Sequence, residues 1–152
     1  NSARARYESE KQPKVIQEAG RFLKTFTSGR YPFIAAPFGE KRVEVVMKDR
    51  RRKEIAALSR GTAEQLYLSL RFGFIETFAN KSEALPVIMD EILVNFDPIR
   101  AREAAEAMME LSRRHQILFF TCHPWIVDIF KEVAADVPVL KISEGRVESL
   151  KV

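Results

Sequence analysis

A short apolar run that ends in two carboxylates constrains the fold of this chain more than any other feature. The run covers residues 86–89, and Asp90 and Glu91 follow it directly. So uniformly apolar a segment has no solvated face, which predicts a strand in the centre of a parallel sheet. Open α/β sheets bind ligands just beyond the carboxyl ends of their strands. We therefore expect the two carboxylates at the edge of a ligand site.

The segments around this strand alternate between helical and strand patterns. We predict helices over residues 62–80, 98–114 and 124–133, a second buried strand over 116–121, and a terminal β-hairpin over 137–150 with its turn at 143–145. This order of elements predicts an α/β fold, with a parallel sheet core flanked by helices.

The first sixty residues carry weaker patterns. Residues 1–12 are polar and charge-mixed. From Pro13 a helix is predicted, because Ile16, Ala19, Leu23 and Phe26 share one face. This helix is either a surface helix packed on the domain or the last turns of a coiled coil. Strands are predicted over residues 31–38 and 43–48, then a charged turn over 49–53 and an extended piece over 54–57.

The helix over residues 62–80 has the strongest pattern. Thr62 and Gln65 have capping-box spacing, and four apolar residues are expected to share one buried stripe. These residues are Leu66, Leu70, Phe74 and Phe78.

Composition narrows the classes of protein. With 46% hydrophobic and 30% charged residues in 152, the chain suits one soluble domain. No run approaches the ~20 apolar residues that span a membrane. A single cysteine, Cys122, fits a reducing cytoplasm. The net charge of +4 is compatible with nucleic acid, and the basic cluster over 50–53 is either a solvated loop or a contact to a phosphate backbone.

Adjacent carboxylates at a buried strand end need a positive partner, and a magnesium nucleotide provides one. Asp90 is expected to hold Mg²⁺ through its water shell, and Glu91 to orient and deprotonate an attacking water. The alternative is an acidic pair in a surface loop. His123 follows the next strand, where an imidazole can hydrogen-bond a γ-phosphate; His115 is expected to be structural and Cys122 a buried spacer.

A second group of residues suits a phosphate. Ser59 offers a hydroxyl, and Gly61 lets a ligand approach the backbone at the start of the helix. The alternative is a simply capped helix with a glycine hinge. Asn95 and Asp97 follow the carboxylate strand and either line the same site, or Asp97 only caps the helix that Pro98 begins.

In their order and spacing, these motifs resemble the C-terminal half of an ATP-binding-cassette (ABC) ATPase head. Ser59, Gly61 and Gln65 match the signature motif, and Asp90 and Glu91 match the Walker B pair. The D-loop is matched by Asn95 and Asp97, and the switch histidine by His123. The likeness is closest to SbcC- and YhaN-type heads, relatives of the structural-maintenance-of-chromosomes (SMC) proteins, over residues 27–31, 58–71, 93–98 and 118–124.

The resemblance implies a P-loop NTPase fold, with residues 1–27 as the root of a coiled coil and 28–152 as the C-terminal lobe. No Gly-x-x-x-x-Gly-Lys-Ser/Thr loop is present, so the resemblance implies an N-terminal half that carries Walker A. It also implies ATP and Mg²⁺ as cofactors and a second head in an ATP-sandwich dimer. DNA, and in some members an SbcD-like nuclease, are the implied partners, in the cytoplasm at the nucleoid and not at a membrane.

The resemblance further implies a divided site. Asp90, Glu91 and His123 would serve the nucleotide of their own head, while Ser59 and Gly61 would serve the nucleotide of the second head. The signature departs from the transporter pattern at Arg60 and Thr62. Two other hypotheses remain: the nucleotide-binding domain of a transporter, and an ABC-like dimerisation or DNA-clamp module that has lost hydrolysis.

Overall fold

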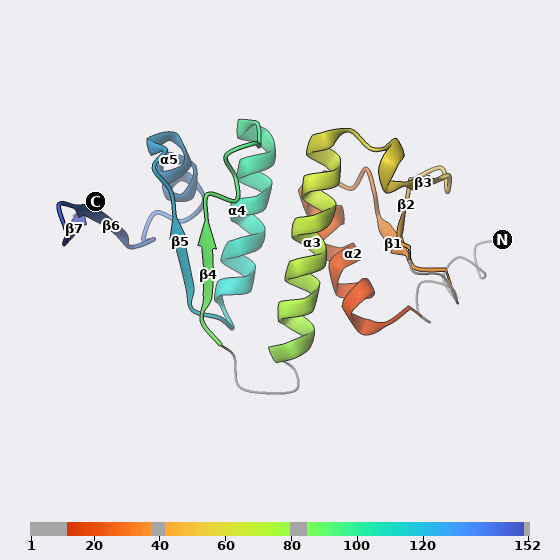
Figure 1. The fold of residues 1–152 in the computed structure, drawn as a ribbon, viewed down its shortest axis with the longest axis horizontal. Coiled ribbons are helices and arrows are strands. Elements are labelled where there is room, and N and C mark those ends of the chain that lie inside the picture. Colours follow the sequence, from red (N-terminus) through yellow and green to blue (C-terminus); the bar gives the residue numbers. More distant parts are fainter. Residues whose placement is uncertain (1–11, 38–41, 80–84, 151–152) are drawn as a thin grey trace.

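The computed structural model describes residues 12–37, 42–79 and 85–150, and shows two sheets and a hairpin arranged around a row of helices (Figure 1). The elements are α2 (Lys14–Phe26), β1 (Phe33–Ala35), β2 (Glu44–Val46), β3 (Arg52–Glu54), the 3₁₀ turn η1 (Ile55–Ala57), α3 (Arg60–Ala79), β4 (Val87–Asp90), α4 (Pro98–Ser112), β5 (Ile117–Phe120), α5 (Pro124–Val133), β6 (Val139–Ser143) and β7 (Arg146–Leu150).

The strands form three separate groups within the described part of the chain. β1, β2 and β3 pair antiparallel beside α2, and β6 and β7 form the predicted hairpin. β4 and β5 pair in parallel, with Ile88 opposite Leu118 and Asp90 opposite Phe120. The predicted α/β fold with a parallel pair and a terminal hairpin is therefore confirmed.

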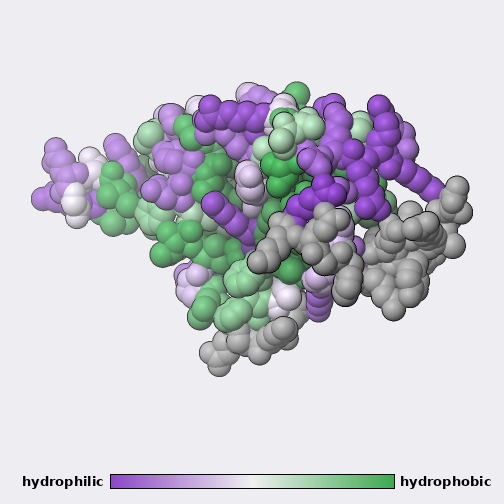
Figure 2. Space-filling view, turned by 45° about the vertical axis from the view of Figure 1, so that its right-hand side comes forward, coloured by the Kyte–Doolittle hydropathy of each residue, from purple (hydrophilic) through white to green (hydrophobic). Residues whose placement is uncertain are grey.

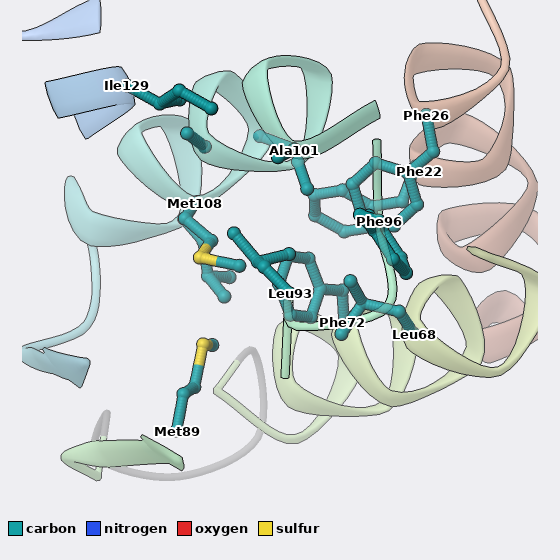
Figure 3. Close-up of a cluster of buried hydrophobic side chains, with 14 of the residues drawn as sticks. Phe22, Phe26, Leu68, Phe72, Met89, Leu93, Phe96, Ala101, Met108 and Ile129 are labelled. Carbon is teal, nitrogen blue, oxygen red and sulfur yellow. The ribbon is translucent and has the colours of Figure 1, made fainter. Parts of the chain in front are cut away.

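The main core lies between α2, α3, α4 and the β4–β5 pair (Figure 3). Phe22 of α2 meets Phe72 of α3 edge to face, with ring centroids 5.2 Å apart. Leu93 and Phe96 reach into the same cluster from the loop after β4. The core thereby fixes that loop, which follows the two carboxylates.

Helix α3 buries a different stripe from the predicted one. Leu66 is buried, but Phe74 is 63% and Phe78 45% exposed, while Leu68 and Phe72 are buried instead. The prediction was wrong because α3 contributes to two separate cores: Leu66 packs in the smaller one with Leu23 of α2, while Leu68 and Phe72 pack in the main one. The buried residues of α3 therefore do not form one stripe along the helix.

The start of α3 also differs from the predicted capping box. Ser59 precedes the helix, and its Oγ lies 2.9 Å from Thr62 Oγ1 and 3.4 Å from the Thr62 backbone N–H. Gln65 is 2% exposed and donates to the carbonyl oxygen of Phe26 at the end of α2. Ser59, and not Thr62, is therefore the capping residue, and Gln65 joins α3 to α2.

Four further expectations need correction. The charged turn over 49–53 is shorter than predicted, since Arg52 begins β3, and the extended piece over 54–57 is mostly the turn η1. β4 has one neighbour among the described strands, and Ile88 is 71% exposed, so its outer face is open in this chain. The predicted strand over 31–38 is shorter than predicted, since β1 covers Phe33–Ala35; residue 38 lies outside the described part.

Helix α2 begins after Pro13 and ends at Phe26, as predicted. It buries Leu23 in the cluster that contains Leu66 of α3, and Phe26 in the main core. Residues 1–11 lie outside the described part, so the division at residue 27 stays a prediction. None of the described helices is long and apolar enough to cross a membrane.

Two helical glycines give a stability prediction. A Cβ on Gly73 would lie 2.6 Å from the carbonyl oxygen of Val15, whereas a Cβ on Gly20 would find ordinary contacts at 3.5 Å or more. We expect Gly73→Ala to destabilise the fold by about 1–3 kcal/mol through overpacking. Gly20→Ala is the matched control and should be neutral or gain up to ~1 kcal/mol from helix propensity. Urea unfolding followed by circular dichroism measures both; equal midpoints would contradict the tight α2–α3 contact.

Candidate nucleotide site

The backbone at the end of β4 presents Glu91 in an unusual conformation. β4 ends at Asp90, and Glu91 has a φ of 50° while its N–H donates to the carbonyl oxygen of Phe120 at 3.0 Å. A non-glycine residue in the left-handed region is uncommon and often marks a functional position. The strand end therefore holds the Glu91 backbone firmly on β5.

The Glu91 carboxylate is held by the turn that follows β5. One oxygen accepts from the backbone N–H of Cys122, and the other accepts from Thr121 Oγ1 at 3.1 Å. His123 Nε2 lies 3.9 Å from the second oxygen. The Cys122 hydrogen bonds, then the one from Thr121 and the charge of His123, hold the pKa of Glu91 below its usual range. Glu91 is therefore ionised at neutral pH and next to the imidazole.

Asp90 has the features that a magnesium ligand needs. Its side chain is exposed at the carboxyl end of β4, and within the described ranges it makes no ion pair or side-chain hydrogen bond. An exposed carboxylate with free oxygens suits a hard, hydrated cation. The residues present therefore fit Mg²⁺ at this strand end.

The turn that precedes α3, with Ser59 and Gly61, forms a second cluster around Arg100. A Cβ on Gly61 would overlap the Arg100 guanidinium, so the absence of a side chain lets Arg100 lie against the first turn of α3. Ser59 is exposed at the same turn. A hydroxyl, a glycine and a guanidinium thus meet at the N-terminus of a helix of 20 residues.

Arg100 connects this turn to the predicted D-loop. Its Nε lies 3.3 Å from Asp97 Oδ2, and its backbone N–H donates to Asp97 Oδ1 at 3.0 Å. Asp97 is the cap of α4, as one of the two sequence hypotheses held. Asn95 is exposed in the loop just before it. The sequence-predicted residues therefore divide into a Glu91–His123 group and a Gly61–Asp97 group.

Sequence reasoning missed or misplaced several residues. Cys122 is exposed, not a buried spacer, because it lies on the turn between β5 and α5. Gln65 faces the interior, so its part in nucleotide binding stays a prediction that the burial does not favour. Thr121 and Arg100 were missed. Their polar side chains after a strand and in the first turn of a helix were the available signals.

His115 is 5% exposed, and its Nδ1 lies 3.3 Å from the carbonyl oxygen of Leu85. This burial at the end of α4 agrees with the structural role expected of it.

Comparison with known proteins adds independent evidence. No protein-family model matches the chain. Over 119 residues it is 34% identical to the uncharacterised protein YhaN of Bacillus subtilis (strain 168). The matched residues make up 78% of this chain but only 12% of YhaN.

Solved structures agree on the fold. The SMC head domain from Thermotoga maritima superposes with a TM-score of 0.64 at 17% identity, covering 99% of this chain and 51% of that one. The Smc head with an extended coiled coil, bound to the C-terminal domain of ScpA from Pyrococcus furiosus, gives 0.64 at 17%, covering 90% and 34%. Together with the YhaN match and the motif order, these likenesses show that the chain has the fold of the C-terminal region of an SMC-like ABC-type ATPase head.

Proposed function

We propose that this chain is the C-terminal part of a head that binds and hydrolyses ATP, dimerises around it, and couples hydrolysis to DNA binding or processing. The observation that carries the proposal is the Glu91 carboxylate, ionised at the end of β4 and 3.9 Å from His123. An ionised carboxylate and an imidazole at the carboxyl edge of a parallel pair suit water attack on a phosphate.

The residues of this chain divide the work. Glu91 would orient the attacking water and accept its proton, and Thr121 would position the Glu91 carboxylate through the hydrogen bond at 3.1 Å. His123 would donate a hydrogen bond to the γ-phosphate. Mg²⁺ held by Asp90 would supply neutralising charge on the phosphates as the bond breaks.

The signature group would act on a different nucleotide. Ser59, Gly61 and the N-terminus of α3 form an anion-binding surface, with the Arg100 guanidinium against it. Arg100 also contacts Asp97 of the proposed D-loop. Through Arg100, the turn that would touch the second head is therefore connected to the loop that follows Glu91. Head closure and catalysis would be coupled through this contact.

The exposed apolar side chains on the outer face of the β4–β5 pair support the proposal that a further lobe packs there. Ile88, Leu118 and Phe120 are all more than 40% exposed, and the hairpin exposes Ile142 and Val147 opposite each other. Figure 2 shows apolar side chains reaching the surface over a broad area beside the hydrophilic upper edge. So many large exposed apolar side chains suggest an interface. We assign the face of the β4–β5 pair to the N-terminal, Walker A-bearing lobe.

The chain spans about an eighth of YhaN, about half of one SMC head and about a third of the other, so the DNA partner rests on likeness alone. The basic cluster offers limited support, because Arg51 pairs with Asp49 and Arg52 with Glu44. An SbcD-like nuclease partner and a place at the nucleoid belong to the same proposal.

The direct test is magnesium-dependent ATP hydrolysis by the complete protein, with the N-terminal lobe present. Absence of turnover with and without DNA would favour the non-hydrolysing clamp hypothesis. A Walker A loop about a hundred residues upstream with no coiled coil between would favour the transporter hypothesis.

The isolated chain gives a separate prediction. Without a phosphate loop it should bind ATP at least about tenfold more weakly than the complete protein, since the cradle of backbone N–H groups is lost. Isothermal titration on both proteins measures the difference. Micromolar binding by the isolated chain would contradict the assignment of the phosphate cradle to another lobe.

A further inference from the structure

Three different metal-binding side chains meet beside the strand end. One ligand atom each from Glu91, Cys122 and His123 lies within 4.8 Å of the other two. Cys122 is exposed, and Glu91 and His123 are partly buried, so solvent ions reach the group. The proposed hydrolysis uses the first and third side chains, and gives the thiol no part beyond its hydrogen bond to Glu91.

The chemistry of the group does not suit Mg²⁺. Magnesium demands octahedral oxygen ligands, whereas a thiolate, an imidazole and a carboxylate are the ligands of tetrahedral Zn²⁺. Tetrahedral zinc with three such ligands keeps its donor atoms about 3.3–3.6 Å apart. The His123–Glu91 distance of 3.9 Å is already close to this range. Side-chain movements of about 1 Å would bring all three ligand atoms into this range. Cys122 and His123 both lie on the short turn before α5.

We propose that Glu91, Cys122 and His123 form a site for a thiophilic divalent cation such as Zn²⁺, and that its occupancy inhibits hydrolysis. The inhibition rests on the function proposed above; the metal site does not. Binding releases the thiol proton to solvent and leaves the fourth position to water. With its carboxylate on the metal, Glu91 no longer accepts a proton from the attacking water, and His123 no longer reaches a phosphate.

The binding test uses the complete protein with Co²⁺ alone, a spectroscopic substitute for Zn²⁺. We expect a thiolate-to-cobalt charge-transfer band that Cys122→Ala abolishes and that Zn²⁺ displaces. Asp136→Asn, a carboxylate change at the exposed turn after α5, is the matched control and should keep the band. The difference between wild type and Cys122→Ala isolates this thiol from other cysteines of the complete protein. A band unchanged in Cys122→Ala, or no band in wild type, overturns the site.

The kinetic test compares each protein with its own zinc-free rate under excess magnesium ATP. We expect Zn²⁺ to lower wild-type turnover at least about tenfold, as blocking a general base should, and to change Cys122→Ala less than about twofold. Equal inhibition of both proteins would overturn the regulatory role. If the wild type shows no turnover even without zinc, the proposed function fails, while the cobalt band still decides the metal site.

Discussion

Glu91→Gln is expected to lower ATP turnover of the complete protein by about 10²–10⁴-fold, the range that one general base supplies. The amide keeps the size of the side chain and removes both its negative charge and its ability to accept a proton. ATP-dependent dimerisation should persist, because the signature cluster around Gly61 is unchanged. Steady-state phosphate release measures turnover, and light scattering with and without ATP measures dimerisation.

The chain offers a matched control for this substitution. Glu144 has a φ of 49°, almost that of Glu91, and lies exposed in the hairpin turn. Glu144→Gln makes the same chemical change on the same backbone conformation away from the site, and should leave turnover within about twofold. Unchanged hydrolysis in Glu91→Gln would remove Glu91 as the base. Loss of both turnover and dimerisation would instead indicate a structural role.

The parts of the fold that were predictable depend on local chemistry. The Asp97–Pro98 start of α4, the end of β4 at Asp90 and the hairpin turn at Gly145 follow from capping, apolar runs and a glycine with a φ of 75°. Each of these signals involves residues near one another in sequence. Local patterns therefore located the elements and the strand end that carries the carboxylates.

The parts that were not predictable depend on contacts between distant segments. The stripe on α3 was misplaced because α3 contributes buried residues to two separate cores, and periodicity alone predicts a single stripe. The contact between Gly61 and Arg100 joins residues 39 positions apart, so neither motif predicts the other. The outer face of β4 was not predictable for a similar reason: its apolar sequence predicts that both faces are covered, whereas Ile88 is 71% exposed.

The division of the site between two heads predicts that two inactive variants restore each other. Gly61→Asp places a negative charge where a phosphate should bind. The Arg100 guanidinium, the end of a flexible side chain, must move to make room, and an acidic residue is well tolerated in the first turn of a helix. Mixed with Glu91→Gln, it forms dimers in which one site carries both substitutions and the other carries neither. With random pairing and independent sites, the mixture should recover about a quarter of wild-type turnover.

The matched control is a mixture of Glu91→Gln with Asp90→Asn. Both residues lie at the end of β4 and would serve the nucleotide of their own head, so every site in a mixed dimer keeps one defect and turnover should stay at the level of the single variants. Recovery in the first mixture and none in the second would place Gly61 on the second nucleotide. If neither mixture recovers, although dimers form, the signature turn acts within its own head. The Gly61–Arg100–Asp97 contact would then be a link inside a single site and not one between two.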